Sequence, residues 1–260
     1  YIFVLSVGPL LYLIIKKQRL KDLLPLKMPK ISILFLAVTI SLGISQIGDY
    51  ITSLLQYLLN FINFVPADLP FNSSKEFGFA SILFIIYLSV LPPFFEEFSI
   101  RGVMIGNLRK SAPWAAVVFS ALAFSVMHGT VQQMPGAFLF GLAVGYFVVR
   151  YESIWIGVIV HFINNLMASG FTVMSNIVPK NALDISSLLI TVLFFVFLSV
   201  GIPLFLVFNG FKLPKKSDNE LGFKSSMKAL LKSVGFWIFI AAGIAYFIMQ
   251  NFESLRKMIS

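Results

Sequence analysis

Long apolar runs alternate with short polar segments along the whole chain. Within the runs, apolar and polar positions do not alternate residue by residue, which favours helices over the strands of a membrane barrel. A helix needs about 20 apolar residues, or slightly fewer, to cross a bilayer. The pattern therefore predicts an all-α, polytopic transmembrane bundle of about eight spans. The predicted spans cover 1–15, 31–47, 78–108, 114–128, 134–149, 154–168, 188–208 and 234–249.

Four stretches refine this pattern. Residues 50–65 are apolar with polar positions at helical spacing, and they form either an interfacial helix or the end of a long second helix. Pro92 and Pro93 remove backbone donors inside the third run, so they should kink or break its helix. Residues 169–184 and 211–232 are polar enough to be loops, on the outer and the inner side respectively.

The composition supports a membrane protein. Hydrophobic residues make up 58% of the chain and charged residues only 12%, and the mean hydropathy is +0.90. Soluble domains carry roughly twice that share of charge. We expect one integral, multi-pass membrane domain over residues 1–260. Residues 80–170 are expected to be the core that carries the polar motifs.

The charge of the chain is unevenly placed. The formal net charge is +9, and most Lys and Arg residues lie in short loops that the predicted spans bring to one side. This asymmetry is typical of the cytoplasmic side of a membrane protein, so we expect anionic lipid as a partner and exclude nucleic acid. The chain has no cysteine, which excludes a disulfide, a thiol nucleophile and a thiolate metal site.

Ionisable residues interrupt the apolar runs at a few positions. Glu96, Glu97 and Arg101 follow Pro92 and Pro93 in the third run. The two histidines of the chain also lie in apolar runs, at His128 and His161. A charge in hydrocarbon costs a few kcal/mol or more, and such residues usually face a cavity, pair with one another or mark a functional site.

These residues fall at similar depth. A helix rises about 1.5 Å per residue, which places Glu96 roughly 20 Å from the inner marker Arg109. By the same rule His128 lies roughly 22 Å past the inner turn before it, and His161 roughly 16 Å past Arg150. We therefore expect three separate helices to bring these side chains together.

Spacing within each motif suggests roles. Glu97 and Arg101 are four residues apart and can pair on one helix face. Glu96 points about 100° away from Glu97, toward a cavity where, with His128, it can take a proton from a water.

His161 and Asn165 are also four residues apart. They present N–H donors on one face, and such a pair can stabilise an oxyanion.

Each feature also has a structural explanation. A Glu–Arg pair in a membrane helix can serve packing alone, and a single His or Asn in a span is often only hydrogen-bonded to a neighbouring helix. Phe124, four residues before His128, is one of 29 phenylalanines. Gly141 and Gly145 form a G-x-x-x-G pattern that indicates close helix packing. The combination of the three polar motifs is what favours a functional site.

The three motifs together resemble those of the CPBP family of intramembrane proteases, also called the Abi or lysostaphin-resistance family, which includes the CAAX prenyl endopeptidases. The family pattern is E-E-x-x-x-R, then F-x-x-x-H, then H-x-x-x-N or D. This chain has Glu96-Glu97-x-x-x-Arg101, Phe124-x-x-x-His128 and His161-x-x-x-Asn165. One small departure is Ile100, where bacterial members often have Phe.

The resemblance implies an intramembrane endopeptidase that acts on a lipidated or membrane-associated peptide or protein, in a bacterial cell membrane. It implies that Glu96 and His128 activate water and that His161 and Asn165 hold the oxyanion. Glu97, Arg101 and Phe124 would support this geometry.

Metal dependence is a separate question. Two His and two Glu could bind Zn²⁺, with Glu97, His128 and His161 as the expected ligands. The chain lacks the H-E-x-x-H pattern of zinc proteases, and a His paired with an Asn suits an oxyanion better. We therefore favour a mechanism without a metal or other cofactor.

Two other function classes remain open at this stage. A non-catalytic membrane regulator, or a bacteriocin self-immunity protein of the same family, would share the fold but would not need an active Glu96. A proton- or ion-coupled transporter would use the midplane carboxylates. The absence of a repeat that carries the motifs twice disfavours the transporter.

Overall fold

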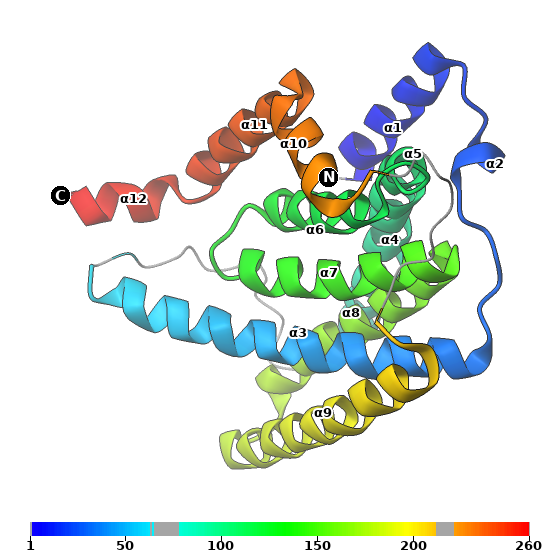
Figure 1. Ribbon diagram of the computed structural model, residues 1–260. Coiled ribbons are helices and arrows are strands. Elements are labelled where there is room, and N and C mark those ends of the chain that lie inside the picture. Colours follow the sequence, from blue (N-terminus) through cyan, green and yellow to red (C-terminus); the bar gives the residue numbers. More distant parts are fainter. Residues whose placement is uncertain (1, 63, 65–77, 212–220, 260) are drawn as a thin grey trace.

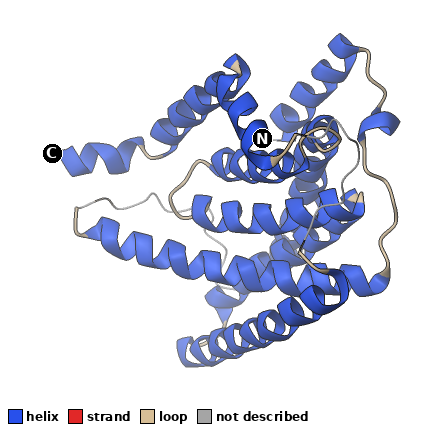
Figure 2. Ribbon diagram, viewed as in Figure 1, coloured by secondary structure: helices blue, strands red, loops and turns tan. Residues whose placement is uncertain are grey.

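The computed structural model describes residues 2–62, 64, 78–211 and 221–259, and in these ranges its regular elements are all helices (Figures 1 and 2). This confirms the predicted all-α bundle. Besides the helices there is an isolated antiparallel bridge between Leu26 and Ser153. The helices are α1 (Ile2–Lys16), α2 (Leu20–Leu23), α3 (Ile31–Asn60), α4 (Phe79–Glu96), the π-helix η1 (Glu97–Met104), α5 (Ile105–Leu108), α6 (Pro113–His128), α7 (Met134–Tyr151), α8 (Ile154–Ile177), α9 (Lys180–Asn209), α10 (Phe223–Lys232), α11 (Val234–Gln250) and α12 (Phe252–Ile259).

The number of full-length spans is smaller than the eight expected. In the described part of the chain, five helices are long and apolar enough to cross a membrane, or six if α10 and α11, which are bent by 72°, count as one span. The other two predicted spans are present as shorter apolar helices, α6 and the Val7–Lys16 part of α1. The chain is thus an integral membrane protein with several spans, and some of its helices are shorter than a bilayer is thick.

The centre of the bundle is made by α3, α6, α7 and α8, with α4 against α8 and α9 against α3 (Figure 1). Small residues allow these helices to approach closely. A Cβ on Gly48 of α3 would lie 2.6 Å from the Cα of Gly136 in α7, and a Cβ on Gly141 would lie 2.9 Å from the Cα of Ala121 in α6. The G-x-x-x-G pattern therefore serves packing, as predicted.

One stretch takes one of its two predicted forms, and two others differ from expectation. The second run continues as one long helix to Asn60, which selects that alternative for 50–60, whereas 65–77 lie outside the described residues. The outer loop predicted over 169–184 is almost entirely helical, because α8 runs to Ile177 and α9 begins at Lys180. The basic inner loop contains helix α10, although 212–220 are outside the described residues.

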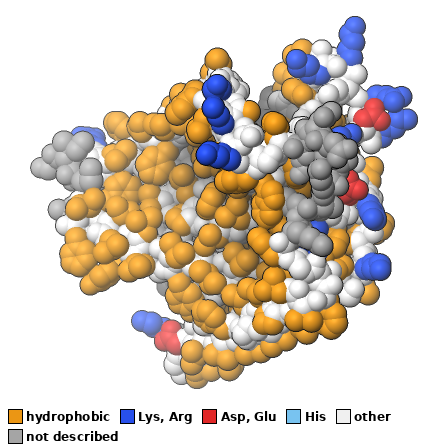
Figure 3. Space-filling view, in the orientation of Figure 1, with side chains coloured by type: hydrophobic (Ala, Val, Ile, Leu, Met, Phe, Trp, Pro, Cys, Tyr) orange, Lys and Arg blue, Asp and Glu red, His pale blue; other side chains and the backbone are white. Residues whose placement is uncertain are grey.

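Charge gathers at one end of the bundle. Figure 3 shows hydrophobic side chains over most of one face, with Lys and Arg mainly toward α2 and the start of α3. Six exposed cations lie between the end of α1 and the start of α3: Lys16, Lys17, Arg19, Lys21, Lys27 and Lys30. Arg109, just past α5, is buried, and this burial lowers the pKa of its guanidinium while the charge of Glu152 opposes the shift.

Candidate active site

The structure brings the predicted polar motifs together. Glu96 is the last residue of α4, Arg101 lies in η1, His128 ends α6, and His161 lies in α8. Glu96 and His161 are each only 3% exposed. Glu96, Arg101 and His161 all lie close enough to His128 to interact electrostatically with it. The similar depths inferred from helix rise therefore correspond to one cluster.

Glu97 and Arg101 form the predicted ion pair. Nη1 of Arg101 donates to Oε1 of Glu97 at 2.8 Å, and both side chains are 0% exposed. Nε and Nη2 of Arg101 and Oε2 of Glu97 have no hydrogen-bond partner among the described residues. Breaking such a buried pair would leave an uncompensated charge, so the pair fixes the position of η1.

The ring of His161 lies between the two carboxylates. Its Nδ1 is 3.0 Å from Oε1 of Glu97, and its Nε2 is 3.8 Å from Oε2 of Glu96. Adjacent glutamates, although about 100° apart around a helix, thus reach opposite nitrogens of one imidazole. Because a carboxylate accepts, Nδ1 donates to Glu97 and Nε2 faces Glu96.

Phe124 is the apolar centre of the cluster. Its ring is 2% exposed and lies edge-on to His128 and to His161, with centroids 4.8 and 5.3 Å away. The Cζ atom of Arg101 lies 4.4 Å from the centre of the same ring. This cation–π contact helps to stabilise the buried charge of the guanidinium, whose Nε and Nη2 have no hydrogen-bond partner among the described residues. Phe124, which is not distinctive in the sequence, therefore touches three of the polar residues.

The hydrogen bond of His128 selects its tautomer. Nδ1 of His128 lies 2.7 Å from the carbonyl oxygen of Phe124. A carbonyl oxygen can only accept, so Nδ1 carries the proton. In the neutral ring, Nε2 then keeps a free lone pair and can act as a base.

Asn165 bonds to a carbonyl that a proline has left without its usual donor. The carbonyl of Leu88 would normally accept from the N–H of residue 92, which is a proline. Nδ2 of Asn165 donates to this carbonyl at 3.1 Å. An amide nitrogen has two N–H groups, so one bond to Leu88 leaves a second donor. Asn165 thus joins α8 to α4 beside the cluster.

Serines extend this junction by one turn. Oγ of Ser89 donates to the carbonyl of Ile85 at 2.6 Å and lies 3.3 Å from Oγ of Ser169. Ser169 in turn donates to the carbonyl of Asn165 at 2.7 Å. Ser89 and Ser169 thus join α4 to α8 beside Asn165. Helix α4 continues through Pro92 and Pro93 instead of breaking there.

The helix changes form at the glutamates. Residues Glu97–Met104 are a π-helix, directly after α4 and directly before α5. Short π segments inside α-helices occur often at functional sites. Here the wider turn holds Glu97 and Arg101, so the change in helix form coincides with the buried ion pair.

Two site residues were not identified from the sequence. Gly157 lies directly against Oε2 of Glu97, and a Cβ at this position would collide with that oxygen. Phe140 of α7 packs against the ring of His161 at 5.5 Å. The position of Gly157 four residues before His161, on the same helix face, is a signal that could have revealed it.

The charges of the cluster nearly balance. Glu96 and Glu97 contribute two negative charges when ionised, and Arg101 contributes one positive charge. One proton on either His161 or Glu96 makes the group neutral, which strongly reduces the cost of burying it. The cluster therefore places carboxylates and an imidazole within reach of one another, as acid–base chemistry requires.

The ligands considered for a metal ion already contact neighbouring groups of the protein. Within the described ranges, no group of three or more His, Asp or Glu side chains is arranged to hold one. Of the ligands considered from the sequence, His161 directs Nδ1 to Glu97 and His128 directs Nδ1 to a backbone carbonyl. Glu97 is already engaged by Arg101.

The comparison with protein families concerns this same segment. Residues 78–167 match the family described as type II CAAX prenyl endopeptidase Rce1-like. The segment that holds the site is similar to the Rce1-like family. The match includes α4, η1, α6, α7 and the part of α8 that carries His161 and Asn165, and it confirms the family resemblance inferred from the motifs. Members of this family are typically proteases. Neither the curated proteins nor the solved structures gave a significant match to the chain.

Proposed function

We propose that the chain is an intramembrane endopeptidase that hydrolyses a peptide bond of a lipidated or membrane-associated peptide or protein. The observation that carries this proposal is the cluster of two glutamates, two histidines and one arginine around Phe124, in which every member except the half-buried His128 is buried. The similarity of this segment to a family of endopeptidases supports it. Buried ionisable groups in a membrane helix are costly and are usually functional.

Glu96 and His128 are the proposed water-activating pair. Nε2 of His128 has the free lone pair, and Glu96 interacts electrostatically with this ring. Together they take one proton from a water, and the resulting hydroxide attacks the carbonyl carbon of the scissile bond. The C–N bond then breaks, and the stored proton goes to the departing amine.

His161 and Asn165 are the proposed oxyanion donors. With Nδ1 donated to Glu97, His161 can donate from Nε2 when the ring carries both protons. Asn165 can use the N–H that is not bonded to Leu88. Glu97 and Arg101 act by position, since they hold the His161 ring in place.

We propose that catalysis needs no metal. The support for this is that, within the described part of the chain, no three His, Asp or Glu side chains are grouped so that they could hold a metal ion. The remaining groups supply a base and oxyanion donors, which together are sufficient for peptide hydrolysis.

The test is cleavage of a pool of membrane peptides by the full chain in detergent, with and without a strong chelator. We expect Glu96→Gln to reduce cleavage by roughly 10²–10⁴-fold, the range for loss of an acid–base group. Glu253→Gln, an exposed carboxylate on α12, is the matched control and should cleave like the wild type. Activity should survive the chelator.

Three outcomes would contradict the proposal. Full activity of Glu96→Gln would exclude the assigned base, and loss of wild-type activity in chelator would indicate a metal enzyme. If the wild type cleaves nothing and Glu96→Gln rescues a deletion strain, the chain is a non-catalytic membrane partner.

A further inference from the structure

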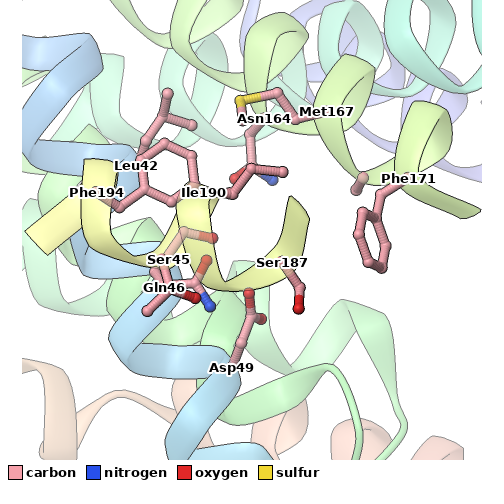
Figure 4. Close-up of a pocket in the computed structure, with 12 residues that line it drawn as sticks. Leu42, Ser45, Gln46, Asp49, Asn164, Met167, Phe171, Ser187, Ile190 and Phe194 are labelled. Atoms are coloured by element: carbon pink, nitrogen blue, oxygen red, sulfur yellow. The ribbon is translucent and has the colours of Figure 1, made fainter. Parts of the chain in front are cut away.

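A second polar region lies next to the cluster, in a pocket of about 390 Å³ between α3, α8 and α9 (Figure 4). This volume lies within the range of about 300–1,000 Å³ found for small-molecule sites. Four residues of each helix line it, among them Asp49 of α3, Asn164 of α8 and Thr191 of α9.

The lining divides into an apolar and a polar part. In Figure 4, Leu42, Ile190 and Phe194 lie together, whereas Gln46, Asp49 and Ser187 lie at the other end. A hydrogen bond of 3.0 Å between Tyr50 and Thr191 connects α3 to α9 beside the pocket. Polar groups at one end of an apolar pocket usually set the orientation of a ligand.

Asp49 is the single charged residue that lines this pocket. Within the described part of the chain, its carboxylate has no ion-pair or hydrogen-bond partner. The start of α7 lies beside it, with Oδ1 3.6 Å from the position of a Cβ on Gly136. A helix start supplies only about half a positive charge. A cationic ligand would balance the rest of the negative charge of Asp49.

The pocket lies close to the candidate active site. Asn164 in its wall is three residues from His161, which is about 4.5 Å along α8 and on the same side of the helix. The pocket is much larger than a single ion. Its amides and hydroxyls match the N–H and C=O groups of a peptide, and its apolar part, with Leu42, Ile190 and Phe194, can take apolar side chains.

We propose that this pocket binds a peptide segment with a cationic side chain or amino terminus, whose ammonium pairs with Asp49. The choice of a peptide as occupant rests on the proposed function. The pocket then acts as a subsite that favours substrates with a positive charge near the scissile bond. It adds Asp49, Gln46 and Asn164 to the residues that determine specificity.

Binding is measured separately from cleavage. The probes are two fluorescent hexapeptides of Ala, Leu and Phe residues, one with a Lys and the other with norleucine at the same position. Their dissociation constants are measured by anisotropy with the full chain in nanodiscs of phosphatidylcholine. The Glu96→Gln background prevents turnover during the measurement.

We expect the Lys peptide to bind at least about 10-fold more tightly than the norleucine peptide, the scale of one charge-assisted hydrogen bond. Asp49→Asn should bring this ratio close to one. Asp184→Asn is the matched control, because it removes an exposed carboxylate elsewhere on α9. Ser187→Leu should fill the pocket and weaken binding of both peptides.

Equal affinities for the two peptides in the Glu96→Gln background would overturn the proposed subsite. So would an affinity ratio that Asp49→Asn leaves unchanged. Loss of the ratio when phosphatidylethanolamine is added to the nanodisc would also overturn it, since a lipid amine would then be the occupant. If peptides are cleaved but Asp49→Asn keeps the ratio, only the subsite fails. If no peptide is cleaved but the ratio depends on Asp49, the pocket stands and the proposed enzymatic function fails.

Discussion

The cluster around His161 and the pocket between α3, α8 and α9 place charge in opposite surroundings. In the cluster, Glu97 and Arg101 are 0% exposed and lie against one another. In the pocket, Asp49 is exposed and has no charged partner in the described part of the chain. Groups that stabilise a transition state must be held in place before the substrate arrives, whereas a charge that selects a ligand must remain accessible. Helix α8 borders both regions, with His161 in the cluster and Asn164 in the wall of the pocket.

The largest expected effect comes from breaking the buried pair. Arg101→Ala leaves Glu97 buried without its counter-charge, so we expect a loss of about 3–5 kcal/mol in stability. Arg19 and Asp22 form the control pair, with the same type of contact at 3.0 Å but with side chains 70% and 52% exposed. Arg19→Ala should cost about 1 kcal/mol or less. Thermal unfolding in detergent and the yield of inserted protein measure both variants.

Equal melting temperatures for Arg101→Ala and Arg19→Ala would contradict the role given to burial. Arg101→Lys helps to interpret the result. Lysine keeps the charge but not the planar guanidinium over Phe124. The stability of the Arg101→Lys variant should therefore fall between those of the wild type and Arg101→Ala.

Asn165→Ala should lower cleavage by roughly 10²–10³-fold, the scale for loss of one oxyanion donor. It should also cost about 1–3 kcal/mol in stability, because the carbonyl of Leu88 loses its donor. Asn176→Ala changes an exposed asparagine of the same helix and should alter neither quantity.

Pro92→Ala separates these two effects. It supplies a backbone N–H to Leu88, so Asn165→Ala in this background should recover stability but not cleavage. Recovery of cleavage as well would show that Asn165 acts only as a helix-joining residue.

The smallest of these effects concerns Gly157. Gly157→Ala pushes a methyl group against Oε2 of Glu97, and overpacking of this kind costs about 1–3 kcal/mol. Gly170 in the same helix has nothing within 4 Å of its Cβ position, so Gly170→Ala should be neutral or slightly stabilising. Melting temperatures of the two variants decide the point. Equal shifts would mean that α8 does not approach Glu97 closely.

The sequence predicts the parts of the site that depend on regular helix geometry. Spacing of four residues predicts the Glu97–Arg101 pair, which is present at 2.8 Å. Helix rise from the basic loops predicts that Glu96, His128 and His161 meet at one depth. Both arguments succeed because the rise and the turn of a helix are nearly constant.

Other features depend on contacts between helices that a single sequence does not specify. The position of Phe124 between Arg101 and both histidines requires the packing of α6 against η1 and α8. The polar segment 169–184 is helical because the ends of α8 and α9 continue beyond the apolar pattern. Pro92 indicates that the carbonyl of Leu88 lacks its backbone donor. The sequence does not indicate that Asn165 of α8 supplies one.

A double-mutant cycle on cleavage tests the central claim most directly. Glu96→Gln, His128→Asn and the double variant are compared with the wild type in single-turnover reactions, with melting temperature as the folding control. If the two residues activate one water as a unit, the double variant should be about as slow as the slower single variant, because residues that act together are not additive. Independent, multiplying losses, or turnover close to wild type in either single variant, would contradict the account.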